Sequence, residues 1–469
     1  MRCCVLEEHE MKKWLCLLAV LALAVVCMSA AAAEEPKTSG DYQYVLRADG
    51  TAEITGYTGA EEELTIPDEL DGAQVTALSR YAFSYCDTLI NVTVPDAVTE
   101  IGDFVFYRCK NLKSVTLPAG INAVGKNPFY MCRKLQAISI PDGSEYLSVE
   151  DSVLMAAPEK RLICFMSGAL DEVSDDPIDY CDVPEGMEII DDYAFAGCAA
   201  LVEVTIPDSV KTIGNRAFRW SPSLQNVTVG SHVTSIGERA FAGCSALKEI
   251  AIPDSVTAIG DRAFNYCVHL SRITFPAGMK EIKDQQLFTG CDKLRTVIIP
   301  EGVTTIGPNA FKDCTALSEI TVPDSLTNID FSAFSNGENM IVSAHMDSAA
   351  ARMLSQNGFA FRVPETDCDV MLVCDESGEN VTAVRAVSGN REAQIIRIPD
   401  GVTEIVPAAF KGYEKLARVY IPDSVTFIGD DVFVDCDKTL KCYIESSAYV
   451  KEYCIANNLD IVTPDMIDH

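Results

Sequence analysis

The sequence predicts a solenoid of stacked coils, in which short parallel strands are joined by helical or 3-10 turns, because it repeats every 23 residues. The pattern I-G-x-x-A-F-x-x-C-x-x-L-x-x-V-x-I-P recurs along the chain, and its phenylalanine marks each copy. The marker residues are Phe83, Phe106, Phe129, Phe195, Phe218, Phe241, Phe264, Phe288, Phe311, Phe334, Phe410 and Phe433. Most are 23 residues apart, one pair is 24 apart, and gaps of 66 and 76 residues interrupt the series. One such unit cannot bury its own apolar face, so neighbouring units must stack.

The second unit shows how each coil is expected to fold. Leu112, Val115 and Leu117 point inward, while the serine and threonine beside Val115 point outward, as in a short strand. Pro118 ends this strand because proline has no N–H to donate to the ladder. The A-F-x-x-C segment is expected to form a helical or 3-10 turn with its phenylalanine and cysteine facing inward. Stacking then produces a parallel sheet along one side of the solenoid.

This 23-residue form, with I-G-x-x-A-F-x-x-C followed by L-x-x-V-x-I-P, resembles the BspA-like leucine-rich repeats of bacterial surface proteins. The resemblance extends from Asp41 to Val462. It implies a leucine-rich-repeat solenoid with α/β-type repeats. It also implies an adhesin-like activity toward host matrix proteins, other cells or glycans, which composition and spacing alone do not show.

The repeats divide into two arrays. Residues 34–362 form the first, with an N-terminal start module, an inserted hairpin near residues 142–183 and a helix–strand cap. Residues 363–469 form a short second array with its own start module and cap. Because the second array holds only two clear repeats, it is expected to lean on the first array or on its own caps.

The N-terminus predicts export. A pair of lysines precedes an apolar run from Trp14 to Met28, and small residues follow up to Ala33. This is the pattern of a secretory signal peptide over residues 1–33. Met11 is an alternative start, because the residues before it are acidic rather than basic. The other interpretation is an uncleaved anchor, the one case in which the chain would contact a membrane.

The charge of the chain limits its partners. Asp and Glu number 69 against 37 Lys and Arg, which gives a net charge of -32. Such a field repels phosphate backbones, so we expect no nucleic acid partner. Solubility of a long exposed surface is the simplest explanation of the excess.

The cysteines follow the repeat. Of the 19, nine occupy one repeat position: Cys86, Cys109, Cys132, Cys198, Cys244, Cys267, Cys291, Cys314 and Cys436. Ser221 and Tyr413 hold the same position elsewhere. We interpret it as a position for a small buried apolar residue. Thiols of adjacent coils could still come within disulfide range.

No catalytic or metal site is predicted. His232, His269, His345 and His469 lie in turns or beside core residues without a nucleophile motif. The acidic pairs Asp191–Asp192 and Asp430–Asp431 are interpreted as solvated surface, and the run Asp171–Asp182 as a solvated loop with weak calcium binding as the alternative. Without CxxC or Cys/His ligand spacing, we expect no zinc, no cofactor and no enzyme activity.

The candidate binding residues lie at one outward strand position. They are Thr93, Thr116, Ser139, Thr205, Thr228, Thr274 and Thr321. Threonine also simply suits an exposed strand, so duplication alone could produce this row. The sequence therefore predicts a secreted or cell-surface binding protein with protein or glycan ligands, and a structural scaffold of the cell envelope is the alternative.

Overall fold

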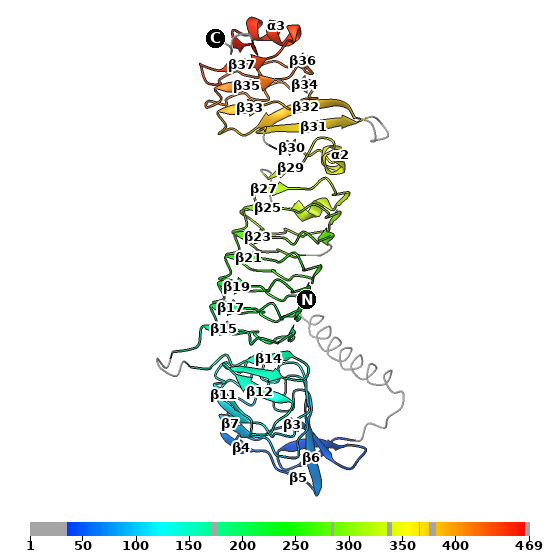
Figure 1. Cartoon of the computed structure of the whole chain (residues 1–469), viewed down its shortest axis with the longest axis vertical. Helices are drawn as coiled ribbons and strands as arrows, with labels where there is room; N and C mark the ends of the chain where they lie inside the picture. Colours follow the sequence, from blue (N-terminus) through cyan, green and yellow to red (C-terminus); the bar gives the residue numbers. More distant parts are fainter. Residues whose placement is uncertain are drawn as a thin grey trace, which may run out of the picture.

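The chain forms one long solenoid (Figure 1). The computed structural model describes residues 35–170, 176–282, 286–334, 340–364, 366–374 and 381–464. The predicted signal peptide, His469 and the first part of the run from Asp171 lie outside these residues. The N-terminal coils lie at one end of the stack and helix α3 (Ala448–Ala456) at the other.

Each regular coil contributes two short strands, so two rows of parallel strands run along the solenoid, divided into several hydrogen-bonded sheets. The longer strands are β4 (Glu63–Thr65), β7 (Asn91–Thr93), β9 (Ser114–Thr116), β11 (Ala137–Ser139), β15 (Tyr180–Asp182), β17 (Glu203–Thr205), β19 (Asn226–Thr228), β21 (Glu249–Ala251), β23 (Arg272–Thr274), β25 (Thr296–Ile298), β27 (Glu319–Thr321), β29 (Ile341–Ser343), β33 (Ile395–Arg397), β35 (Arg418–Ile421), β37 (Lys441–Ile444) and β38 (Asp460–Val462). The short strand β30 (Phe361–Arg362) continues their row after β29. The two-residue strands are β8 (Glu100–Ile101), β10 (Ala123–Val124), β16 (Ile189–Ile190), β18 (Thr212–Ile213), β20 (Ser235–Ile236), β22 (Ala258–Ile259), β24 (Glu281–Ile282), β26 (Thr305–Ile306), β28 (Asn328–Ile329), β34 (Glu404–Ile405) and β36 (Phe427–Ile428). The longer strands line one side of the stack in Figure 1.

The inward alternation predicted for the longer strands is confirmed. In β9, Val115 is buried while Ser114 is half-buried and Thr116 exposed, and the flanking Leu112 and Leu117 are buried. Strands pair with the equivalent strand of the next coil, as β17 does with β19 through Val204 and Val227. The row of two-residue strands was not predicted, because a strand of two residues is too short to show an alternating pattern.

The marker phenylalanines form a stacked column in the core. The rings of Phe195, Phe218, Phe241 and Phe264 are fully buried. Their successive centroids are 4.8, 5.0 and 5.5 Å apart, and the rings are within 8° of parallel. Burial of a phenylalanine contributes roughly 1.5–3 kcal/mol, so this column is a main source of stability.

The turn around each phenylalanine differs from the one predicted. The 3-10 turn forms at Phe331–Phe334 (η1). In most other described coils the residues two before and two after the phenylalanine have positive φ, for example Arg216 at 57° and Trp220 at 59°. Hydrogen bonds between residues three apart, such as Arg219 N–H to the Arg216 carbonyl at 3.1 Å, close successive β-turns. The left-handed residues bend the chain back and direct their side chains onto the outer edge.

The repeat cysteines donate hydrogen bonds. The Cys244 thiol donates to the Phe218 carbonyl of the preceding coil at 3.1 Å, and Cys109, Cys132, Cys267, Cys314 and Cys436 make the equivalent bond. Ser221 fills the position with the same bond, at 2.7 Å to the Phe195 carbonyl. The described cysteines are all free. In these coils the position holds a hydrogen-bond donor, where the sequence indicated only a small apolar residue; Tyr413 also donates from it, to the Gly389 carbonyl at 3.0 Å.

The remaining elements interrupt or flank the coils. They are β1 (Lys37–Ser39), β2 (Tyr42–Leu46), β3 (Ala52–Tyr57), β5 (Glu69–Leu70), β6 (Ala73–Leu78), β12 (Leu147–Glu150), β13 (Val153–Ala156), β14 (Arg161–Phe165), β31 (Cys368–Cys374), β32 (Val381–Gly389) and helix α2 (Ala349–Gln356). Ser348 caps α2 and Ser447 caps α3, each by accepting a backbone N–H. Strand β30 pairs with β31, so the stack continues past residue 362. The division into two arrays at that point stays a prediction.

The antiparallel hairpin β13–β14 separates two cores. Val153, Met155, Leu162 and Phe165 pack into the core that continues to Cys454. Leu154, Ala156, Ile163 and Cys164 pack into the core of the N-terminal coils. A strand buried on both faces is apolar at every position, which explains why these two segments show no alternation.

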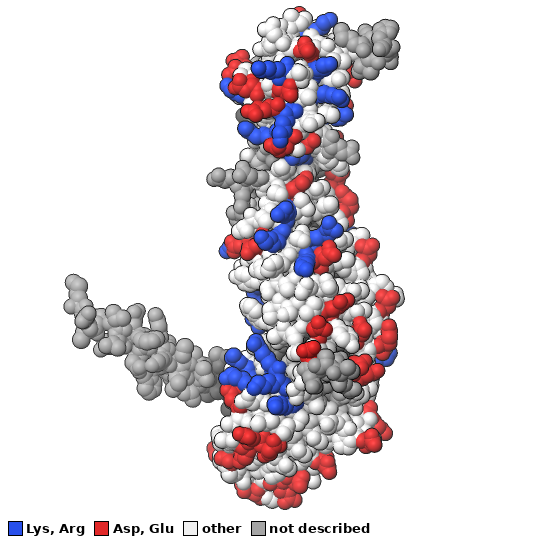
Figure 2. All heavy atoms as spheres, turned by 90° about the vertical axis from the view of Figure 1, so that its left-hand side faces the viewer, with Lys and Arg blue, Asp and Glu red and all other residues white. Residues whose placement is uncertain are grey.

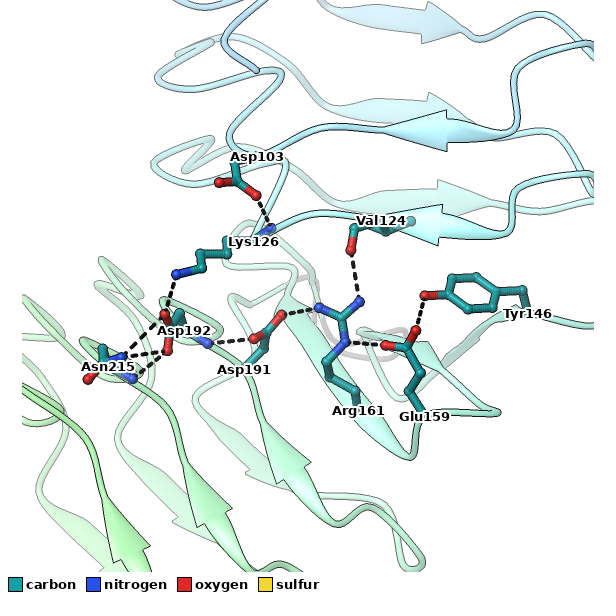
Figure 3. A network of polar contacts seen from close by, with 9 residues as sticks. All are labelled: Asp103, Val124, Lys126, Tyr146, Glu159, Arg161, Asp191, Asp192 and Asn215. Carbon is teal, nitrogen blue, oxygen red and sulfur yellow. Dashed lines mark hydrogen bonds and ion pairs between the residues drawn. The ribbon is translucent and has the colours of Figure 1, made fainter. Parts of the chain in front are cut away.

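A polar network joins the N-terminal coils to the hairpin and the next coils (Figure 3). Arg161 pairs with Asp191 at 2.7 Å and with Glu159 at 2.8 Å, and it donates to the Val124 carbonyl of β10. Lys126 pairs with Asp192 at 2.8 Å.

The interpretation of Asp191 and Asp192 as solvated surface is wrong. Their side chains are 14% and 15% exposed, because the inserted hairpin covers this turn. Burial raises the pKa of Asp191, and Arg161 opposes that effect. Asp430 and Asp431 are exposed, as expected.

The donor role of the thiols can be tested at Cys244. Cys244→Ser retains a donor and Cys244→Ala does not, so we expect Ala to be less stable than Ser by about 1 kcal/mol in urea unfolding. Equal stabilities, or a more stable Ala variant, would contradict the donor role.

Burial raises the pKa of Cys244 to about 12, so in the folded protein this thiol should not react with iodoacetamide at pH 8.

The junction can be tested at Arg161. Arg161→Met leaves Asp191 largely buried without its partner, and we expect a loss of roughly 3 kcal/mol in the free energy of unfolding. Adding Asp191→Leu should recover part of that loss, because it removes the orphaned carboxylate. Thermal unfolding of the wild type and the two variants measures both effects. A double variant no more stable than Arg161→Met would show that the pair does not couple.

Candidate binding surfaces

The predicted threonine strip lies on the exposed side of the longer strands. Thr93, Thr116 and Ser139 are exposed and stand in register on β7, β9 and β11. Thr205 and Thr228 are paired neighbours on β17 and β19. The structure thus brings the first three together and the next two together. It leaves the others apart.

Other residues interrupt the strip farther along. Thr274 pairs in register with Ala251, and Thr321 pairs with Ile298, which is 70% exposed. Arg272 and Glu249 flank this stretch at 4.0 Å from one another. A shallow hollow lies over β19, β21 and β23. The strip is therefore an open, mostly uncharged strand face, and nothing in its geometry selects one ligand.

The three histidines that the structure describes do not assemble a catalytic group. His232 and His269 each contact a backbone carbonyl of the preceding coil, of Asp208 and Ser245 respectively. His345 contacts Asp324 at 2.8 Å on the surface. Among the described residues, no three His, Cys, Asp or Glu side chains are grouped to hold a metal ion. The part of the chain that the structure describes also lacks a helix long and apolar enough to cross a bilayer.

The edge formed by the left-handed turns carries a second surface, which the sequence did not predict. Aromatic side chains of successive coils meet there: Tyr85 and Tyr107 at 5.3 Å between centroids, and Tyr107 and Tyr130 at 5.5 Å. Arg108 lies 5.7 Å from the Tyr85 centroid and 5.9 Å from that of Tyr107. The hydrogen bond to Tyr85 raises the pKa of Arg108.

The same surface continues across the inserted hairpin. Arg219 lies beside Tyr130 and 5.5 Å from the centroid of Trp220. Burial raises the pKa of Tyr130, and Arg219 offsets part of that effect. We call Tyr85, Tyr107, Arg108, Tyr130, Arg219 and Trp220 the aromatic–arginine patch.

The Trp220 ring packs against the backbone of a glycine in the next coil. A Cβ at Gly243, in the equivalent position of the next coil, would lie 2.8 Å from the indole ring. Tyr266 lies against Gly290 in the same manner, with a Cβ distance of 2.6 Å. The rings of Trp220 and Tyr266 thus pack against backbone while 49% and 53% of each residue stays exposed. They form rigid, half-open platforms.

Positive charge collects near this edge of an acidic protein. Within the described residues, neither Arg108 nor Arg219 has a carboxylate at ion-pair distance. Three further exposed cations lie near Arg108: Lys113 in the coil of Phe106, and Arg133 and Lys134 in the coil of Phe129. Figure 2 shows Lys and Arg side chains gathered on the lower half of the strand face, while Asp and Glu crowd the N-terminal end.

The sequence analysis missed the patch because it searched for repetition. The patch residues occupy the two positions after the marker phenylalanine, where the repeat pattern has no preferred residue. The useful indication was the variation itself: Tyr85, Arg108 and Trp220 hold a position where other coils have glycine, as at Gly197 and Gly243.

Solved structures of bacterial repeat proteins are similar to this chain. A leucine-rich cell surface protein from Faecalibacterium prausnitzii is 28% identical, with 92% of this chain and 99% of that chain covered and a TM-score of 0.39. A leucine-rich repeat protein from Bacteroides ovatus is 18% identical, with 91% and 99% covered and a TM-score of 0.43. The pneumococcal vaccine antigen PcpA is 15% identical, with 92% and 99% covered and a TM-score of 0.40. No curated protein matches the sequence.

The family assignment rests on the repeat itself. The model of the BspA type leucine-rich repeat region matches residues 62–153, 174–289, 284–360 and 384–465. These segments cover more than half of the chain and contain the coils described above. The chain therefore belongs to the BspA-type leucine-rich repeat family.

Proposed function

We propose that the chain is an exported, adhesin-like binding protein, secreted or displayed at the cell surface, which acts by binding protein or glycan ligands and not by catalysis. The observation that carries this proposal is the separation of core and surface. Phenylalanines, thiols and strand-centre residues are buried in most regular coils, which leaves two open faces free to vary. Solenoids use such extended faces for binding.

Family membership supports the proposal. A similar chain is described as a cell surface protein and another as a vaccine antigen. The N-terminal apolar run followed by small residues is consistent with export. The repeat thiols are buried and hydrogen-bonded, which makes them poor nucleophiles.

Export is tested on the protein from its own cells. Medium, envelope and cytosol are separated, and the N-terminal sequence of the protein is determined in each. We expect a mature chain beginning near Glu34 in the medium or on the envelope. An intact N-terminus in the cytosol would overturn the proposal.

Binding is tested with purified protein on panels of matrix proteins, glycans and cells. We expect saturable binding to at least one class. Tight retention in the wall fraction without any external ligand would instead favour a structural scaffold of the envelope.

A further inference from the structure

We propose that the aromatic–arginine patch binds an acidic polysaccharide, whose sugar rings lie on the exposed aromatic side chains and whose carboxylate or sulfate groups pair with Arg108 and Arg219. This inference rests on the proposed function and gives it a ligand class.

The aromatic side chains have the geometry to receive sugar rings. The back of the Trp220 ring is held against Gly243, and 49% of the residue is exposed. Tyr85 is 56% exposed and packs edge-on against Tyr107. The C–H groups on one face of a sugar ring carry slight positive charge, and they meet the negative face of an aromatic ring favourably. The platforms are preorganised, so little conformational freedom is lost on binding.

The arginines supply recognition of negative charge. Arg108 and Arg219 each lie against aromatic neighbours, and neither forms an ion pair within 4.0 Å among the described residues, although Asp87 acts on Arg108 from a longer distance. A guanidinium lying against a ring keeps its N–H groups free for the paired oxygens of a carboxylate or sulfate. Other arginines of the chain do form ion pairs, as Arg216 does with Glu238 at 3.2 Å. Arg108 and Arg219 lack such a pair among the described residues, so their charge stays available to a ligand.

The spacing favours a polymer over a compact ligand. From Tyr85 to Trp220 the patch spans about four coil steps, roughly 20 Å at the usual strand spacing. Exposed cations continue in the next coil at Arg133 and Lys134, whereas Lys110 is paired with Asp87 at 2.6 Å. A chain of repeating acidic sugars matches charges that repeat along an axis.

The repeat turn places the patch side chains at the surface. Tyr85, Arg108 and Trp220 have φ values of 61°, 59° and 59°, as residues at this position do in most coils. Gly197 and Gly243 hold the same position in other coils, so the turn itself does not require a side chain there.

The test uses the full chain carrying Trp14→Phe. The chain has two tryptophans, Trp14 and Trp220, so the remaining fluorescence reports on the patch. The probes are a heparin octasaccharide, a polygalacturonate oligomer, neutral dextran and single-stranded oligo-dT. We expect the acidic sugars to change the emission of Trp220 saturably, with weaker affinity at higher salt, and dextran to have no effect.

Variants locate the site. Arg108→Gln with Arg219→Gln should weaken binding of the acidic sugars at least tenfold. Arg272→Gln with Arg418→Gln removes the same charge from exposed positions on the strand face, and it should change the affinity less than twofold. Trp220→Ala should weaken binding measured by calorimetry, and Phe427→Ala, which removes another exposed ring, should not.

The outcomes separate this inference from the proposed function. Absence of binding to both acidic sugars, equal binding of dextran or oligo-dT, or equal losses in the two arginine pairs would overturn the inference. If matrix proteins or cells still bind the wild type in those cases, the proposed function stands. A cytosolic protein with an intact N-terminus would overturn the proposed function, whatever the sugars do.

Discussion

The register between neighbouring coils is the constraint on which the rest of the structure depends. Most marker phenylalanines donate their N–H to the carbonyl that precedes the next marker, as from Phe218 to Ala240 at 2.7 Å and from Phe241 to Ala263 at 2.8 Å. These bonds recur only if the coils match in length. The single 24-residue spacing keeps the equivalent bond, from Phe264 to Leu287 at 3.2 Å, and the two rings remain stacked. The column of phenylalanine rings, the strand ladders and the thiol hydrogen bonds all depend on this register, because each joins equivalent residues of neighbouring coils.

Burial explains what the sequence could predict. A residue that packs against its equivalents in the coils above and below must be of one chemical class in every copy. Phenylalanine, leucine and valine positions could therefore be assigned inward from the repeat alone. The thiol bond escaped because cysteine resembles a small apolar residue, and only Ser221 and Tyr413 indicated a donor. The burial of Asp191 escaped because its partner, Arg161, lies on the inserted hairpin, which no repeat rule describes.

The two candidate surfaces differ for a related reason. The threonine strip was predicted because it repeats, but repetition on an exposed strand is also what duplication leaves behind. The aromatic–arginine patch does not repeat, so periodicity could not find it. A left-handed conformation costs a residue other than glycine roughly 1–2 kcal/mol. A tryptophan or arginine at this turn therefore carries a conformational cost that glycine avoids, and for Trp220 packing against Gly243 offsets part of it.

A net charge of -32 does not prevent such a patch from holding an anion. Exposed charges act over a Debye length of about 8 Å at physiological ionic strength, which is less than two coil steps. Carboxylates at the ends of the solenoid are therefore screened from Arg108 and Arg219. They still act on any ligand that extends beyond the patch, and Figure 2 shows acidic side chains crowding the N-terminal end. Repulsion by those carboxylates limits how far an acidic chain can extend beyond the patch, so short acidic oligosaccharides are the suitable ligands for the test.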